Sequence, residues 1–155
     1  MPRGRKPKPT ALKKSEGNPG KRELNKNEPR FKPVLPNAPK HLTDDALDEW
    51  RRVAPDLFAA GVLTIADRAA LAAYCQAWAD WVKARGEIAT GGMISTTSNG
   101  YEQQSAWIGI ANKALDNLMK FASEFGLTPA SRARIHAEPP KTPEEEAEER
   151  IFGDA

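Results

Sequence analysis

The side chains that could perform nucleophilic or metal chemistry are few and scattered along this 155-residue chain. His41 and His136 have no neighbouring Cys or His at the spacing of a zinc site. Cys75 lies in an apolar helical pattern, where a thiol is typical of a core position rather than of a nucleophile. No glycine-rich segment ends in Lys-Ser or Lys-Thr as a phosphate-binding loop does. The sequence therefore predicts a protein without catalytic residues, metal or cofactor.

Charge is the feature that does point to a function. Residues 1–40 carry twelve Lys and Arg against three Glu, whereas residues 138–155 carry two Lys and Arg against seven Asp and Glu. Residues 41–137 between them are nearly neutral, with nine basic and eleven acidic side chains. A basic head and an acidic tail favour a polyanionic partner at one end and a different partner at the other.

The basic segment is expected to be a disordered arm, because eight prolines interrupt residues 1–40 and apolar residues are sparse there. Such an arm can follow DNA phosphates or enter a minor groove, although it could also be a solubilising or protein-binding tail. Its segment Arg3-Gly4-Arg5-Lys6-Pro7 resembles an AT-hook core with Lys6 inserted before the proline. The predicted DNA-binding side chains of the arm are Arg3, Arg5, Lys6, Lys8, Lys13, Lys14, Lys21 and Arg22.

A second phosphate contact is predicted at a short helix that begins at Thr128-Pro129. This helix carries Arg132 and Arg134, which could also be no more than a solvated helix end. Beyond it, the cluster Glu144–Glu149 belongs to a polar tail, which rarely preorganises acid–base or two-metal chemistry.

The elements that must position these segments are helical. A first helix is expected after Thr43, with Pro55 ending or kinking it and a stop at Gly61. Thr64 and Asp67 resemble a capping box that opens the longest periodic segment, which runs through Ile88.

That long helix has a bulky stripe and a second stripe of alanines, so it could pack on both sides. It is either the central helix of a monomer or a helix between subunits. On the second interpretation, the predicted oligomer interface consists of Ala66, Ala70, Ala73, Ala77, Trp78 and Trp81, with Trp107 from the next helix.

Between the two long helices, Asn99-Gly100 predicts a short β-hairpin near residues 93–103, because Asn-Gly suits a type I′ turn. A lone two-stranded hairpin is marginal in water, so it should pack on the helices or on another subunit. A second long helix is then expected from Ser105, with Trp107, Ala111, Leu115 and Leu118 on its inner face and a stop at Gly126-Leu127.

The predicted fold class is therefore mostly α. Its core is two long antiparallel helices with short flanking helices and the small hairpin. The expected organisation is a DNA-binding arm over residues 1–40, a helical oligomerisation core over residues 41–137 and a flexible acidic tail over residues 138–155. The chain has one cysteine, so it cannot form an internal disulfide, and its basic N-terminus is not followed by the apolar region of a secretory signal. It also has no apolar run long enough for a transmembrane helix. We therefore expect an intracellular protein outside the membrane.

Several multi-residue segments, in this order, resemble the small terminase subunit of tailed bacteriophages. The similarity spans roughly residues 4–135 and rests on Gly4–Leu12, Glu16–Arg22, Ala66–Trp78, Asn99–Ser105, Ile110–Leu115 and Phe125–Arg132. The family implies a non-enzymatic, mostly helical ring that recognises the packaging-initiation site on concatemeric double-stranded phage DNA. It also implies that the ring delivers this DNA to the large terminase subunit, an ATPase and nuclease, and modulates it.

The resemblance further implies a place in the cytoplasm of the infected bacterial host rather than in the mature virion. Many members carry an N-terminal helix-turn-helix, which the proline-rich first 40 residues cannot form. Contacts to DNA shape or backbone are therefore expected. The alternative from the residues alone is a small dimeric DNA-binding regulator, with 128–135 as its recognition helix, and a third is an adaptor that binds only proteins.

Overall fold

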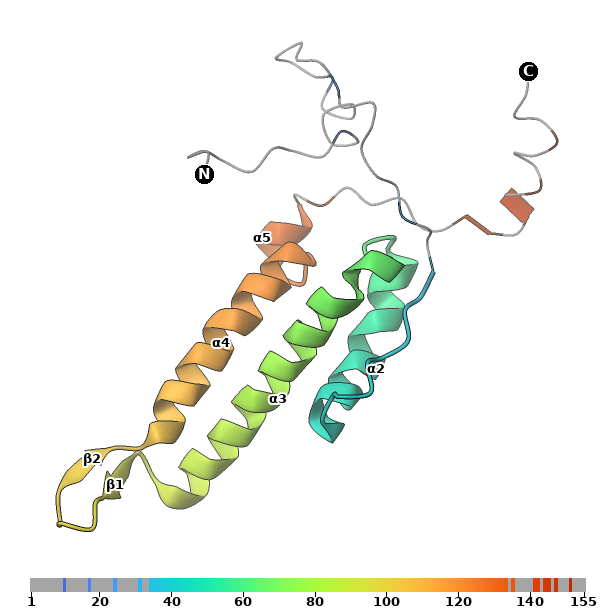
Figure 1. Cartoon of the computed structure of the whole chain (residues 1–155). Coiled ribbons are helices and arrows are strands. Elements are labelled where there is room, and N and C mark those ends of the chain that lie inside the picture. Colours follow the sequence, from blue (N-terminus) through green and yellow to red (C-terminus); the bar gives the residue numbers. More distant parts are fainter. Residues whose placement is uncertain are drawn as a thin grey trace.

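The computed structural model describes residues 34–133 without a break, together with the separate residues 10, 17, 24, 31, 135, 141, 142, 144, 145, 147 and 151. In that part of the chain the fold is mostly α-helical, as predicted. Helix α3 (Arg68–Gly91) lies between α2 (Asp44–Ala59) and α4 (Ala106–Glu124), and it packs against both (Figure 1). A short antiparallel hairpin and the one-turn helix α5 (Pro129–Arg132) lie at opposite ends of α4.

Helix α2 begins after Thr43, with Asp44 and Asp45 in the first turn where the helix dipole favours acidic side chains. The helix does not end at Pro55 but continues to Ala59. A proline leaves the carbonyl of the residue four positions earlier without its helical donor. That residue is Arg51, and both Arg51 and Pro55 are exposed, so solvent can hydrate the carbonyl.

The predicted stops of α2 and α4 are confirmed. Gly61 and Gly126 both adopt a φ of +71°, the left-handed conformation that closes a helix without steric cost in glycine. The N–H of Leu127 donates to the carbonyl of Ala122 at 2.8 Å, which is the long bond of a Schellman motif. The N–H of Val62 donates to the carbonyl of Leu57 in the same way at 2.9 Å.

The predicted capping box before α3 is confirmed too. The N–H of Thr64 donates to Asp67 Oδ2 at 2.9 Å, and the Thr64 hydroxyl accepts from the N–H of Ala66. Residues Ile65–Asp67 form one turn of 3₁₀-helix, labelled η1, before α3 proper begins at Arg68.

The hairpin joins β1 (Ile94–Thr96) to β2 (Glu102–Gln104), with Ser95 opposite Gln103. Its turn differs from the predicted type I′. The N–H of Gly100 donates to the carbonyl of Thr97 at 2.9 Å, so the central residues are Ser98 and Asn99. Gly100 follows this turn with a φ of +82°, an arrangement typical of a three-residue loop with a glycine bulge. The glycine was the correct signal, but one extra residue enters the loop.

The core is divided unequally along α3. The main core holds fifteen buried residues from α2, the first half of α3, the second half of α4 and the intervening loops. A second cluster of three buried residues (Ala84, Ile88 and Ala111) joins the second half of α3 to the first half of α4. Leu115, which the pattern placed on the inner face of α4, is instead exposed.

Residues 34–40 lie against the helices as a strap, although the arm was predicted to extend to residue 40. Pro36 and Pro39 are buried, and Ala38 packs against the main core. Arg68 Nε donates to the carbonyl of Asn37 at 2.7 Å, which ties the strap to the start of α3. The apolar side chains of Phe31, Val34 and Leu35 are exposed.

Candidate nucleic-acid interface and assembly surface

The predicted DNA-binding residues of the arm lie outside the described residues. These are Arg3, Arg5, Lys6, Lys8, Lys13, Lys14, Lys21 and Arg22. The structure does place the point at which the chain reaches the helices. The strap begins toward the end of the bundle that carries α5, opposite the hairpin (Figure 1).

Arg132 lies in the last turn of α5, at the same end of the bundle, and is exposed. The helix begins with a reciprocal cap between Thr128 and Ser131, in which each backbone N–H donates to the other side chain's hydroxyl oxygen at 3.2 Å. Its four residues make about one turn, so the region is too short to serve as a recognition helix. Arg134, the other predicted contact, lies outside the described residues.

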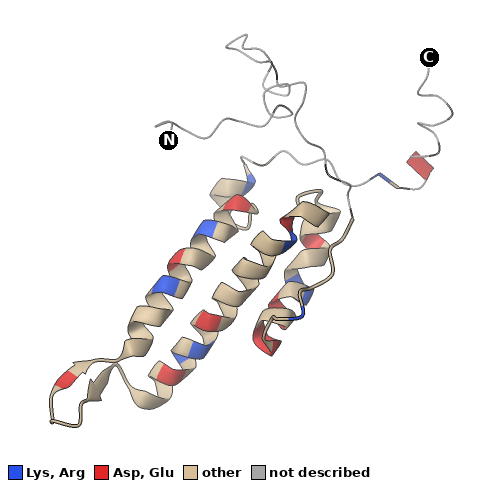
Figure 2. Ribbon diagram, viewed as in Figure 1, with Lys and Arg blue, Asp and Glu red and all other residues tan. Residues whose placement is uncertain are grey.

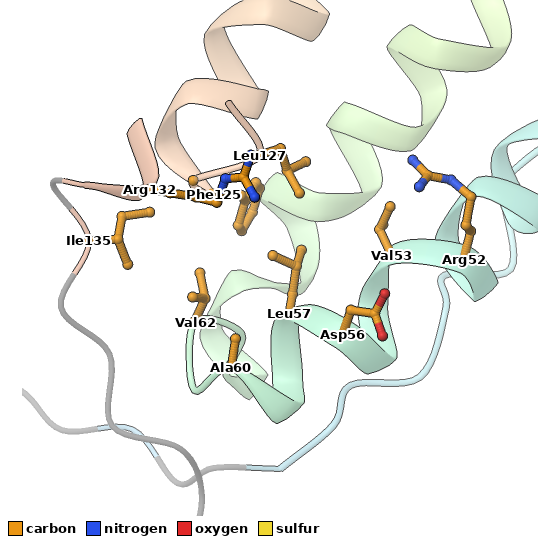
Figure 3. Close-up of a pocket in the computed structure, with 11 residues that line it drawn as sticks. Arg52, Val53, Asp56, Leu57, Ala60, Val62, Phe125, Leu127, Arg132 and Ile135 are labelled. Atoms are coloured by element: carbon orange, nitrogen blue, oxygen red, sulfur yellow. The ribbon is translucent and has the colours of Figure 1, made fainter. Parts of the chain in front are cut away.

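Arg132 also lines an open, mainly apolar pocket of about 350 Å³ between the second half of α2 and the corner that joins α4 to α5 (Figure 3). Leu57, Val62, Phe125 and Leu127 form most of its apolar wall. Arg52 and Asp56 stand at its α2 side. Sequence reasoning did not predict this pocket, because it arises only where the α4–α5 corner folds over α2.

A polar network that sequence reasoning also missed links α2 to α3 beside the pocket. Glu49 is only 4% exposed, and its Oε1 accepts from the Tyr74 hydroxyl at 2.9 Å and from Arg52 Nη2 at 2.7 Å. Its Oε2 accepts from Arg52 Nε at 2.8 Å, so the guanidinium holds the carboxylate with two bonds. The hydrogen bond to Glu49 holds the pKa of Arg52 above its ordinary value. Burial is the main cause that raises the pKa of Tyr74, with the hydrogen bond to Glu49 adding to it.

The available signal for that network was the position of Glu49. It precedes Trp50 on the buried stripe of α2 and lies three residues before Arg52, which is ion-pair spacing on a helix. A buried glutamate requires partners, and the second donor came from a tyrosine 25 residues later that only the packing of α3 could supply.

Cys75 is fully buried in the main core, as predicted. Burial raises the pKa of its thiol to about 12, so the thiolate needed for nucleophilic attack is scarce at neutral pH. His41 is exposed, whereas His136 lies outside the described residues. Among the side chains that the structure describes, no three His, Cys, Asp or Glu residues gather as metal ligands.

The predicted oligomer-interface residues fall into three exposure groups. Ala66 and Ala70 are exposed at the start of the long helical segment, and Ala73 is half-buried. Ala77 is buried within the protomer's own core. The aromatic members are half-buried: Trp78 and Trp81, whose ring centroids lie 5.6 Å apart, and Trp107 on α4. The structure brings Trp81 and Trp107 together around the small second core cluster.

Two comparisons with known proteins are negative, since no curated protein and no solved structure matches the chain significantly. None of the helices in residues 34–133 combines the length and hydropathy that a bilayer crossing requires. The third comparison is positive. A family described as the phage terminase small subunit matches residues 46–142, which include α3, the hairpin, α4 and all but the first two residues of α2. The match covers well over half of the chain, and the chain therefore belongs to the phage terminase small subunit family.

Proposed function

We propose that the chain forms a ring that binds the packaging-initiation site on concatemeric phage DNA. This proposal extends the role in phage DNA packaging that family membership supports, within a family that is generally non-catalytic. The ring then recruits and regulates the large terminase, whose ATPase and nuclease activities this chain lacks. It acts in the cytoplasm of the infected host and is absent from the mature virion.

The observation that carries the DNA-binding part of the proposal is the segregation of charge. Twelve basic side chains precede residue 41 against three acidic ones. The strap that follows this segment begins toward the end of the bundle that carries α5, where Arg132 is exposed. Both features support a single DNA-facing end that includes Arg132 and Arg134, with the arm as its principal contact.

Avidity is the proposed mechanism of binding. One flexible arm that contacts phosphates binds weakly, but several arms on one ring raise the effective concentration of each arm at the DNA. If about six charges of one arm meet phosphates, the logarithm of the binding constant should fall with log salt at a slope near −5.

The proposed ring interface uses the exposed or half-buried alanines of η1 and α3 and the half-buried tryptophans of α3 and α4. Ala66, Ala70 and Ala73 allow close approach of a neighbouring helix, and Trp78, Trp81 and Trp107 present large apolar surfaces. The remaining predicted member, Ala77, would contribute through the protomer's own packing. The acidic tail remains available for the large terminase or for another basic partner.

The alternative, a dimeric DNA-binding regulator, requires a recognition helix that reads base edges. Its candidate segment contains a helix of only four residues, which is a specific argument against it. A regulator would also protect two half-sites about one helical turn of DNA apart, which footprinting would reveal.

The test compares the full chain with a variant that lacks residues 1–30, using native mass spectrometry and a DNA-binding titration at several salt concentrations. We expect one closed species well above a hexamer for both proteins, and DNA affinity that is much weaker in the deletion. A matched control deletes residues 144–155, which removes acidic charge and should not weaken DNA binding. Unchanged affinity after loss of the arm would refute the assignment of DNA binding to it.

A further inference from the structure

The end of the molecule that carries the hairpin, here called the hairpin end, contains the second half of α3, both strands and the first half of α4. Helix α2 does not cover it, because the main core includes α3 residues only as far as Ala79 (Figure 1). What remains is two helices with a cluster of three buried residues between them. A pair of helices with so little buried surface gains little stability of its own.

Large apolar side chains are nevertheless exposed at this end. Met93 is 61% exposed, Ile94 56% and Tyr101 75%, and all three belong to the hairpin or its turn. Trp81 and Trp107 are only partly covered where they pack against the small cluster. Several exposed apolar residues gathered at one end of a molecule indicate a surface that another protein covers.

Within the part of the chain that the structure describes, no further strand pairs with either outer edge of the hairpin. The N–H of Thr97 donates to Tyr101 and that of Ser105 to Met93, both at 2.8 Å, so alternate residues point their backbone groups inward. The backbone groups of Ile94 and Thr96 on β1, and of Glu102 and Gln104 on β2, consequently point outward. Neither strand has the lysine or proline with which proteins commonly block an exposed edge.

Charge decides against DNA as the covering partner. Residues 92–105 contain one charged side chain, the acidic Glu102 (Figure 2). A surface that binds phosphates requires Lys or Arg, and here the hairpin offers none. The occupant is therefore a protein surface of low charge.

A second copy of the same chain fits these requirements. A two-stranded hairpin is marginal in water by itself, so its partner has to be present whenever the protein is folded. A copy of the chain meets that condition and offers the same uncharged apolar residues and the same open edges. A transient partner such as the large terminase would leave the hairpin unsupported between encounters.

We infer that the hairpin end is a contact between neighbouring copies of the chain, in which the β2 edge of one copy pairs with the β1 edge of the next. Met93, Ile94 and Tyr101 are buried in that contact. The arrangement is head-to-tail, which generates a closed ring if the rotation closes. This inference rests on the proposed ring and adds the hairpin strands to the alanine and tryptophan faces proposed above.

The test places a lysine in the contact and measures assembly by native mass spectrometry. In the full-length protein, Ile94→Lys and Tyr101→Lys are made separately. Ile151→Lys serves as the matched control, because it makes the same change at a residue that is 72% exposed in the tail. Circular dichroism verifies that each variant keeps its helices. We expect both hairpin variants to fall to monomers or small oligomers at concentrations where the control remains fully assembled.

The outcomes separate this inference from the proposed function. If the unaltered protein is a monomer, both the proposed ring and the hairpin contact are wrong. If the unaltered protein assembles and both hairpin variants assemble equally well, the ring stands and the hairpin contact is overturned. Hairpin variants that assemble normally but no longer bind the large terminase would identify that protein as the occupant and would also overturn the inference.

Oxidative cross-linking tests the head-to-tail arrangement. Thr96→Cys on β1 and Glu102→Cys on β2 are made in separate proteins and then mixed, unfolded and refolded together. The native Cys75 is fully buried and does not compete in the folded protein. A disulfide that forms in the mixture but in neither protein alone supports pairing of β2 with β1 of the next copy. Disulfides within each single variant, or none in the mixture, would contradict it.

Discussion

The two ends of this molecule differ in how they are stabilised. At the end that carries α5, here called the three-helix end, α2 covers α3, and fifteen residues are buried in one core. At the hairpin end only α3 and α4 remain, with a hydrophobic cluster of three buried residues and several exposed apolar ones. The chain has thus placed most of its buried core at one end. On our proposal, a neighbouring copy of the chain stabilises the other end.

The largest expected loss of stability comes from truncating a buried side chain in the core of the three-helix end. Leu71 is completely buried, and Leu71→Ala should lower the free energy of unfolding by about 2–5 kcal/mol, as core deletions of this kind do. Ile88→Ala at the hairpin end should cost clearly less in the isolated protomer. Denaturant unfolding of both variants at several protein concentrations provides the measurement.

The comparison of the two ends also leads to a prediction about how the effect of Ile88→Ala depends on protein concentration. If neighbouring copies support the hairpin end, the cost of this substitution should depend on protein concentration, because assembly adds to the stability. Equal and concentration-independent costs for both variants would show that the two ends are equally self-sufficient, contrary to our interpretation.

The next effect concerns the buried network at the three-helix end. Tyr74→Phe removes one of the donors to Glu49 and should lower the free energy of unfolding by about 1–3 kcal/mol, because the buried carboxylate loses a partner. Tyr101→Phe is the control, since its ring is exposed on the hairpin. Thermal melting of both variants tests the difference, and equal melting temperatures would deny the network a stabilising role.

A smaller effect is expected at two glycines that share a left-handed conformation. Gly126→Ala and Gly100→Ala should each cost about 1 kcal/mol for the backbone alone. An added Cβ at Gly126 would also meet Ile135 Cδ1 at 2.5 Å, whereas at Gly100 it would meet nothing within 4 Å. The Gly126 variant should therefore be the less stable of the two in chemical denaturation. The reverse order would mean that the α4–α5 corner is loosely packed.

The last expected effect is a loss of folding stability that is absent at neutral pH and appears only at alkaline pH. Burial raises the pKa of Cys75 from its ordinary value of 9.0 to about 12, and that of Tyr74 is raised as well. Because the unfolded chain releases these protons at lower pH than the folded protein does, stability is intact below pH 9 and falls as the pH rises toward 12.

Equilibrium unfolding between pH 8 and 11 tests this dependence. Cys75→Ala should weaken it, because the variant no longer has a buried thiol whose deprotonation favours the unfolded chain. A pH dependence unchanged by that substitution would assign the alkaline loss to Tyr74 and other groups.

The sequence by itself determined the local structure. Helix starts and stops depend on hydrogen bonds between residues a few positions apart, so they could be predicted from short sequence segments. Examples are the capping box at Thr64 and Asp67 and the helix stops at Gly61 and Gly126. The prediction that Cys75 lies in the core rested in the same way on apolar spacing along one helix. The family resemblance was also carried by continuous segments, and the match over residues 46–142 confirms it.

Only the tertiary structure decided how these elements meet. Tyr74 reaches Glu49 because α3 packs on α2, and the pocket exists because the α4–α5 corner lies against α2. The exposure of Leu115 likewise depends on which neighbours are close in space. Above all, α2 is shorter than α3 and covers only part of it, and this difference in extent gives the molecule one end with a large core and one end with a small one.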